Sequence, residues 1–236
     1  SYLRIDNTVG FNYSMLMNIS GKVCDSLNVK TVIMWNSDLW CVKEEWFLEL
    51  LKRHYAANSL VSGTKLVYPP KTMSIRGEVD TENIKIMKGA EHLLDGKWRE
   101  TTQFGGGGWV FTGNNSPLLY SPIHYKRFSD PDSPFVNCDR GDSFVTGALH
   151  IWDLKTFIKI GGMNPSMAKN FQDVDACLKV LELGSVPHYF GKDIYFYHDE
   201  SATLHNIRDH KKFDNKMVSD YQIFAKNWNK KIMEII

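Results

Sequence analysis

Three short motifs contain side chains whose types and spacing could do chemistry: Asn36-Ser37-Asp38, Asp130-Pro131-Asp132 and Asp173-Val174-Asp175. Neighbouring carboxylates repel unless a cation or a donor lies between them, so metal binding is a natural use for such motifs. In the second motif, Pro131 and the following Ser133-Pro134 are typical of a solvated turn. Asp38 differs, because it follows an apolar strand and its carboxylate must be satisfied there. We therefore predict that Asp38 binds a metal or a ligand.

The third motif opens an amphipathic helical segment, where a carboxylate can cap the helix and complement its dipole. A general base also requires a positioned, partly buried carboxylate. On a helix, Asp173 shares a face with Cys177, four residues later, whereas Asp175 does not. One acid can thus face a crevice while the other caps or pairs, and both interpretations remain open.

His198 follows the run DIYFY, residues 193–197, which is apolar and aromatic after its first residue. A lone histidine in that position is more often a structural polar group than a functional one. If its strand were parallel to that of residues 31–35, His198 and Asp38 would leave the sheet at one rim and could share a divalent cation. The hypothesis requires their side chains to approach within about 7 Å, so that one cation can bridge them.

The elements that must position these residues alternate between strand and helix. Residues 30–35 and 64–70 are predicted strands, 42–58 is a helix that begins acidic and ends basic, and 15–27 is an earlier helix. The continuous apolar character of 30–35 is typical of a strand covered on both faces. The alternation predicts an α/β fold, a Rossmann-like, mostly parallel sheet flanked by helices, with ligands beyond the carboxyl ends of its strands.

A loop-rich insertion is predicted at 71–145, which is rich in Gly, Pro, Ser and Asn and holds a weak helical pattern at 81–94. A structureless loop of that length is unusual, so we expect short strands and a functional surface within it. The glycine run in 104–108 lacks the lysine and the strand-to-helix setting of a phosphate cradle, which favours a flexible loop.

The remaining chain is predicted to form a strand, two helices, a final strand and a helical C-terminal tail, at 143–152, 154–162, 171–185, 186–201 and 205–236. We expect one domain over 1–204, which includes the insertion, and a tail over 205–236.

Composition and charge exclude several classes of protein. The 236 residues are 43% hydrophobic and 23% charged, with a net charge of +1, which is ordinary for a globular protein and argues against nucleic acid as a partner. No apolar stretch approaches the roughly 18 residues that would span a membrane. The four cysteines lack zinc-like spacing and are expected to be reduced, which favours a cytoplasmic location, including the inner face of a membrane.

Five segments in order resemble glycosyltransferase family 2, the inverting enzymes of the GT-A fold. They are DNTVGFNYSMLMN with an Asn–Gly–Phe turn, VIMWNSDLW with a D-x-D-type motif, FVTGALHIW with Thr-Gly-Ala, IGGMNPSMAKNFQDVDACLKVLELGSVPHYF with an acidic helix start, and YHDESAT with a closing histidine. One such motif means little, but their common order makes the resemblance specific.

The resemblance implies a metal site and a catalytic base. Asp38 matches the acid through which Mg2+ or Mn2+ holds the donor diphosphate, although Asn36 replaces the first acid of the motif. His198 matches an additional metal ligand. Asp173 matches the catalytic base, and Asp175 matches a second acid that we interpret as mainly structural.

The resemblance also implies which residues contact the substrates. Donor binding is expected from Asn7, Gly10, Asn36, Ser37 and Asp38. The acceptor side is expected to include Thr146, Gly147, Ala148, Trp40, Trp109 and Gln172, the last of which replaces the usual glutamate. The implied donor is a nucleotide sugar with UDP or dTDP, the acceptor is a glycan or glycoconjugate, and the cofactor is a divalent cation, as in polysaccharide biosynthesis.

The first part of the nucleotide-binding half, which would precede the Asn–Gly–Phe turn, has no counterpart in the sequence. We expect the sheet to expose an edge there, which favours self-association. Two alternatives remain open. One is a non-catalytic GT-A remnant that binds glycans or a partner. The other is a sugar-nucleotide pyrophosphorylase, which needs a glycine-rich basic loop that the sequence lacks.

Overall fold

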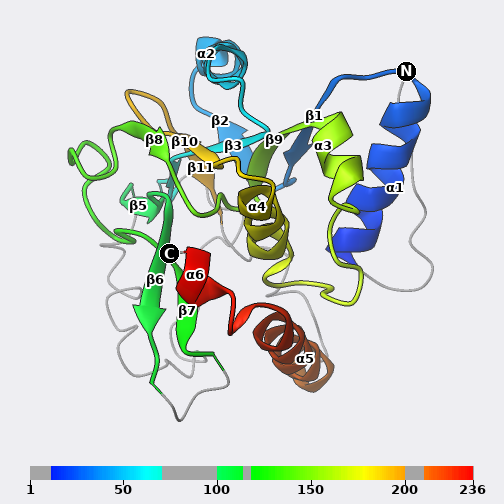
Figure 1. Cartoon of the computed structure of the whole chain (residues 1–236). Coiled ribbons are helices and arrows are strands. Elements are labelled where there is room, and N and C mark those ends of the chain that lie inside the picture. Colours follow the sequence, from blue (N-terminus) through cyan, green and yellow to red (C-terminus); the bar gives the residue numbers. More distant parts are fainter. Residues whose placement is uncertain (1–11, 71–99, 114–117, 200–209, 236) are drawn as a thin grey trace.

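The computed structural model describes residues 12–70, 100–113, 118–199 and 210–235. In that part, helices flank two mixed sheets and a hairpin (Figure 1). The helices are α1 (Tyr13–Ser26), α2 (Glu44–Ala56), α3 (Leu154–Lys159), α4 (Gln172–Glu182), α5 (His210–Trp228) and α6 (Ile232–Ile235). Helices α1 and α3 pack against each other beside the larger sheet, and α5 lies below α4 (Figure 1). None of the described helices is long and apolar enough to cross a membrane.

The larger sheet has the strand order β1-β9-β3-β10-β8. Its strands are β1 (Thr31–Trp35), β9 (Leu149–Asp153), β3 (Val61–Thr64), β10 (His188–Phe190) and β8 (Asp139–Gly141). Strand β9 is antiparallel to both β1 and β3, and β10 is parallel to β3. Strands β1, β3 and β10 therefore point the same way, while β9 runs against them between β1 and β3.

The smaller sheet has the order β2-β11-β4-β5, and a separate hairpin joins β6 to β7. These strands are β2 (Leu39–Cys41), β11 (Phe196–His198), β4 (Leu66–Val67), β5 (Thr102–Phe104), β6 (Gly107–Phe111) and β7 (Tyr120–His124). Two predicted strands, 64–70 and 186–201, each divide between the two sheets. The first strand breaks at Lys65, between β3 and β4, and the second at residues 191–195, between β10 and β11. After the breaks, β4 and β11 pair in parallel in the smaller sheet.

The α/β fold with flanking helices and a C-terminal helix is confirmed, but the strands are not mostly parallel among those described. Of the pairings in the two sheets, β10 with β3 and β11 with β4 are parallel, and the others are antiparallel. The apolar run of β1 is not covered on both faces either: β1 is an edge strand among those described, Met34 is its buried residue and Trp35 is exposed. Apolar composition alone says nothing of strand direction, which explains the wrong prediction. The predicted short strands in the insertion are present as β5 to β8.

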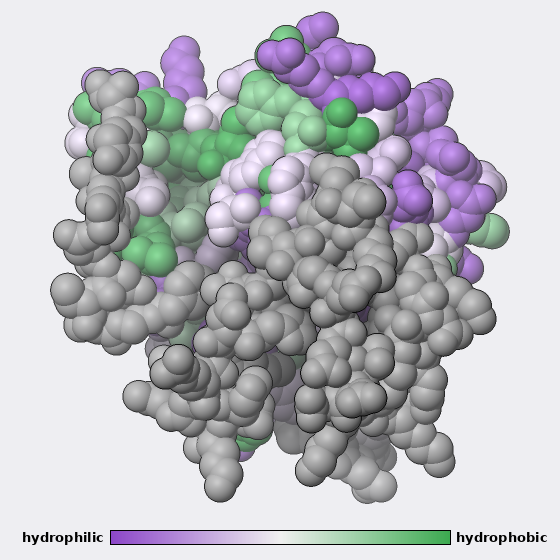
Figure 2. All heavy atoms as spheres, turned by 180° about the vertical axis from the view of Figure 1, so that it is seen from behind, coloured by the Kyte–Doolittle hydropathy of each residue, from purple (hydrophilic) through white to green (hydrophobic). Residues whose placement is uncertain are grey.

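The core lies between the larger sheet and its helices. Its fully buried side chains include Trp152 and Leu149 of β9, Phe157 of α3 and Leu178 of α4. Phe224 of α5 is buried in the same cluster. Seen from behind, hydrophilic residues cover the upper right margin of the molecule, and hydrophobic residues gather toward its upper left (Figure 2).

Several predictions lie outside the described residues or at their edge. Asn7 and Gly10 fall in 1–11, and the weak helical pattern at 81–94 falls in 71–99. The predicted division near residue 204 stays a prediction, because 200–209 is also outside the described part.

The second acidic motif forms a turn, as predicted. The main-chain N–H of Asp132 donates to the carboxylate of Asp130 over 2.9 Å. The buried ammonium of Lys65 donates to the carbonyl of Pro131 at 2.7 Å and to the side chain of Asn137 at 3.0 Å. Burial lowers the pKa of Lys65, and the nearby acids, Asp132 first among them, oppose that shift. The motif thus packs over a buried lysine at the junction of the two sheets.

The glycine run forms a packed turn between β5 and β6, and the prediction of a flexible loop is wrong. Gly106 has a φ of +109°, and a Cβ there would overlap the guanidinium of Arg140 and the carboxylate of Asp142. These two groups form an ion pair at 3.2 Å, and Arg140 also donates to the carbonyl of Gly105 at 2.5 Å. Glycine is required because the backbone has a positive φ and passes directly over this partly buried ion pair.

Substituting this glycine should destabilise the fold more than substituting a glycine in open space. Gly106→Ala should lower the free energy of unfolding by about 2–4 kcal/mol, because it adds overpacking to the cost of a positive φ. The matched control is Gly113→Ala, whose φ is +79° with nothing within 4 Å of the added Cβ. It should cost only about 1–2 kcal/mol. Denaturant unfolding measures both, and equal losses would contradict the packed turn.

Candidate active site

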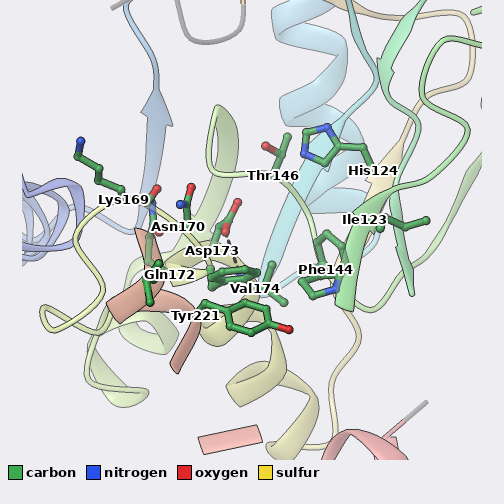
Figure 3. Close-up of a pocket in the computed structure, with 13 residues that line it drawn as sticks. Ile123, His124, Phe144, Thr146, Lys169, Asn170, Gln172, Asp173, Val174 and Tyr221 are labelled. Carbon is green, nitrogen blue, oxygen red and sulfur yellow. Dashed lines mark hydrogen bonds between the residues drawn. The ribbon is translucent and has the colours of Figure 1, made fainter. Parts of the chain in front are cut away.

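A pocket of about 550 Å³ lies between β7, the segment before β9 and the start of α4. Its wall includes His124, Phe144, Thr146, Gln172, Asp173 and Tyr221, which converge from different elements (Figure 3). Its volume is within the usual range for small-ligand sites, roughly 300–1,000 Å³.

The Asp173 carboxylate is fixed by two main-chain donors at this pocket. The N–H of Gly147 donates to its Oδ2 at 2.6 Å, and the N–H of Val174 donates to its Oδ1 at 2.9 Å. Burial raises the pKa of Asp173, and the two hydrogen bonds oppose that shift. The N-cap of α4 is Phe171, in the left-handed region, and no side chain caps it. Asp173 is therefore not the N-cap residue. From the first turn, its carboxylate accepts one main-chain N–H of α4 and also joins α4 to the segment before β9.

A chain of buried polar groups holds Gly147 in place. The Tyr13 hydroxyl donates to the carbonyl of Gly147 at 2.6 Å and lies 3.3 Å from Nε2 of His150. The indole of Trp152 donates to Nδ1 of His150 at 2.9 Å. Burial lowers the pKa of His150 to about 3, so the imidazole is neutral and its other nitrogen carries the hydrogen that reaches Tyr13. These residues hold Gly147 at its carbonyl, on the far side of its Cα from the N–H that donates to Asp173.

The loop before α4 is held from two sides. The Ser14 hydroxyl of α1 donates to the carbonyl of Met167 at 2.6 Å. On the other side, the Asp220 carboxylate of α5 accepts the N–H groups of Ala168, Lys169 and Asn170 at 3.1, 2.9 and 3.0 Å. Asp220 is buried, and sequence reasoning missed it because it lies in a polar helix that was predicted to be a tail.

Asp175 and Gln172 make contacts within the framework of the site. Asp175 is buried, accepts from the indole of Trp228 at 2.7 Å and pairs with Lys179 at 2.7 Å. These contacts join α4 to α5 and agree with the structural interpretation of this acid. Gln172 lines the pocket and donates to the carbonyl of Lys169 at 3.0 Å.

Asp38 and His198 lie together although 160 positions separate them in the chain. Nε2 of His198 is 3.3 Å from Oδ1 of Asp38, so the predicted approach within about 7 Å is confirmed. The reason differs from the one predicted: β11 is antiparallel to β2, and His198 is paired with Leu39, the residue after Asp38. The main-chain N–H of Asn36 donates to the carbonyl of Ala148 at 2.9 Å, which joins this turn to the segment that contains Gly147.

The two residues suit a divalent cation by type and spacing. Two adjacent ligands about 2.1 Å from one octahedral ion lie about 3 Å apart, close to the separation of these two atoms. A carboxylate oxygen and an imidazole nitrogen form a donor set that manganese accepts. No cluster of three or more His, Cys, Asp or Glu with metal-site geometry occurs in the described part of the chain. Asp38 and His198 would therefore supply two ligands and leave other positions to a bound molecule or water.

The predicted acceptor-side residues do not all reach the pocket. Thr146 lines it, and Gly147 contacts Asp173. The indole of Trp109 donates to the Ser143 hydroxyl at 2.8 Å and lines a separate cavity of about 650 Å³. Trp40 belongs to β2 and is not among the pocket-lining residues. Ala148 is buried and contributes its carbonyl to Asn36, while Ser37 is exposed in the turn before Asp38.

Comparison with known proteins supports the fold. No protein-family model and no curated protein matches the chain. Among solved structures, it is similar to the crystal structure of GalNAc-T7 with UDP, GalNAc and Mn2+. The TM-score is 0.50 at 10% sequence identity, and the match covers 82% of this chain but 31% of that one. The fold is thus GT-A-like, and the chain spans about a third of the length of this structural neighbour.

Removing the Asp220 carboxylate, which we call the clamp because it accepts three main-chain N–H groups of the loop before α4, should destabilise the protein. Asp220→Ala leaves three main-chain donors near the pocket without their acceptor. The expected loss in the free energy of unfolding is about 2–4 kcal/mol, and Asp220→Asn should lose less because it keeps one oxygen. Gln222→Ala, on an exposed position of the same helix, should change stability by about 0.5 kcal/mol or less. Denaturant unfolding that finds Asp220→Ala as stable as this control would contradict the clamp.

Proposed function

We propose that this chain belongs to an inverting glycosyltransferase like those of family 2. It would transfer a sugar from a UDP- or dTDP-sugar to a hydroxyl of a glycan or glycoconjugate. The observation that carries the proposal is the Asp173 carboxylate, which two main-chain donors hold at the wall of a sugar-sized pocket in a GT-A-like fold. The Asp38–His198 pair supplies the second element of such a site.

Asp173 acts as the general base in this proposal. It accepts the proton of the acceptor hydroxyl as the hydroxyl oxygen attacks the anomeric carbon, and the bond to the nucleoside diphosphate breaks on the opposite face. One displacement inverts the anomeric configuration and needs no protein nucleophile. The hydrogen bonds from Gly147 and Val174 hold the carboxylate in position, and burial raises its pKa and hence its basicity.

Gly147 leaves room for the Asp173 carboxylate in this arrangement. A Cβ at that position would lie 3.2 Å from Oδ2 of Asp173, tighter than most such contacts. A larger residue would move the carboxylate away from the peptide that orients it.

Asp38 and His198 would hold a divalent cation, which neutralises the charge that grows on the leaving diphosphate when it is bound. The structural neighbour carries UDP and Mn2+, which supports this choice of cofactor and of nucleotide. With Asn36 in place of the first acid, Asp38 is the carboxylate of the motif. Affinity for the cation therefore depends on His198 and on the donor itself.

Replacing the base tests the proposal directly. In the complete protein, Asp173→Asn should lower turnover about a hundredfold or more, because an amide cannot accept the proton. One of two hydrogen-bond acceptors is lost, so stability should fall by only about 1 kcal/mol. The control is Asp153→Asn, which alters the side-chain cap of α3 outside the pocket and should preserve turnover.

The pH dependence follows from the raised pKa of Asp173. The base works only when ionised, so turnover should fall as the pH drops through that pKa, at a higher pH than an ordinary carboxyl would give. Steady-state rates measured against pH test the predicted pH dependence. NMR of the product's anomeric carbon tests whether the configuration is inverted. Wild-type rates in Asp173→Asn would reassign the base, and glycan binding without transfer from any donor would favour the non-catalytic module.

The metal pair predicts a different phenotype. Asp38→Asn should weaken donor binding about tenfold or more and remove its dependence on Mn2+, because the amide is a poor ligand. Titration of UDP with and without Mn2+ measures the effect. Asp132→Asn, which changes an exposed acid of the second motif, should bind like the wild type. Unchanged Mn2+ dependence in Asp38→Asn would remove this site from the mechanism.

A further inference from the structure

Gln103, in the middle of β5, lies between the metal pair and the pocket of Asp173. Its side-chain Oε1 is 2.9 Å from Nδ1 of His198. Its main-chain carbonyl is 3.1 Å from Nδ1 of His124, which lines the pocket. The residue is fully buried, and it reaches His198 across the two-residue strand β4. One residue therefore contacts an imidazole on each side of the site.

The contact with Oε1 decides which nitrogen of His198 carries the hydrogen. An amide oxygen can only accept, so Nδ1 must be the donor of this hydrogen bond. In the neutral ring, Nε2 then carries a lone pair, and it faces Oδ1 of Asp38 at 3.3 Å. Two acceptors at that distance are unfavourable unless something positive lies between them. Either a proton on Nε2 or a cation shared by the two atoms resolves the conflict, and only the cation leaves the ring neutral.

We propose that Gln103 is a positioning residue that holds His198 in its Nδ1–H tautomer and so presents the Nε2 lone pair to a divalent cation shared with Asp38. This inference rests on the proposed function of the Asp38–His198 pair. In metal sites, the second nitrogen of a ligating histidine commonly donates to such an outer partner, which orients the ring and raises its basicity.

The burial of Gln103 also favours this role over simple packing. Its Nε2 has no hydrogen-bond partner among the described residues and is buried. A buried amide with unmade hydrogen bonds is unfavourable, and an apolar side chain of similar size would avoid that penalty. The orientation of His198 gives a reason for a glutamine at this position. The same strand also fixes His124, whose positive charge would lower the pKa of Asp173.

The test combines two readouts on the complete protein. The first is the tautomer of His198 from 15N NMR, recorded under conditions where the ring nitrogens show the shifts of a neutral imidazole. The second is the affinity for Mn2+ alone, from electron paramagnetic resonance. Wild type should show the Nδ1–H tautomer. Gln103→Leu should lose that preference, let Nε2–H turn toward Asp38, and bind Mn2+ about 10–100-fold more weakly.

Two further variants separate orientation from packing. Gln103→Glu keeps an acceptor of the same size for Nδ1–H, so it should retain the wild-type tautomer and bind Mn2+ at least as well. Thr102→Val, a buried change of similar volume on the same strand, should alter neither readout. If Gln103→Leu does not fold, the role of Gln103 is still tested by two results: the tautomer of His198 in the wild type, and the tautomer and Mn2+ affinity of Gln103→Glu.

The outcomes distinguish this inference from the proposed function. An Nε2–H tautomer in the wild type, or unchanged Mn2+ affinity in Gln103→Leu, overturns the role of Gln103 alone, provided that Asp38→Asn and His198→Ala weaken Mn2+ binding. If those two variants bind Mn2+ like the wild type, the proposed metal site fails, and the role of Gln103 fails with it.

Discussion

The candidate site depends on keeping one carboxylate, that of Asp173, in a largely buried position where main-chain donors must satisfy it. An ionised group in such a place needs donors, and the peptides of Gly147 and Val174 supply them. Gly147, the first of these donors, precedes β9 and is far from α4 in the chain. The segment before β9 and the start of α4 must therefore keep a fixed position relative to each other. The hydrogen bonds among Tyr13, His150, Trp152 and the carbonyl of Gly147 hold the segment before β9 in that position.

Helix α5 completes the arrangement. Its Asp220 gathers three peptides of the loop before α4, and its Trp228 donates to Asp175 within α4. Phe224 stacks on Phe171, the residue that opens α4, with ring centroids 5.0 Å apart. A helix that was predicted to be a tail is thus part of the support of the pocket, since Asp220, Phe224 and Trp228 each contact α4 or the loop before it.

The second half of the site depends on the pairing of short strands. Asp38 and His198 meet because β11 lies against β2, and Gln103 reaches His198 because β5 closes the same sheet. Strands of two or three residues contribute little stability by themselves. Their positions are set by the breaks at Lys65 and at 191–195, where the chain leaves the larger sheet, and by the glycine turn that packs over the Arg140–Asp142 pair.

The sequence by itself determined the α/β class, the position of the main helices and the turn at Asp130–Asp132. These follow from local information: helical periodicity, turn residues and the order of motifs along the chain. The structural interpretation of Asp175 rested on the same pattern, and its contacts with Trp228 and Lys179 agree with it.

Tertiary structure alone decided strand direction, the packing of the glycine turn and the partners of the site residues. An apolar strand has the same composition whichever way its neighbour runs, so the reversal of β9 left no signal in the sequence. Tyr13, Gln103, His124 and Asp220 were missed for a related reason. Their roles arise from contacts with residues far away in the chain, and a polar residue in a strand or helix does not reveal which distant group it will meet. Side-chain partners of this kind exist only once the sheets and helices have closed around them.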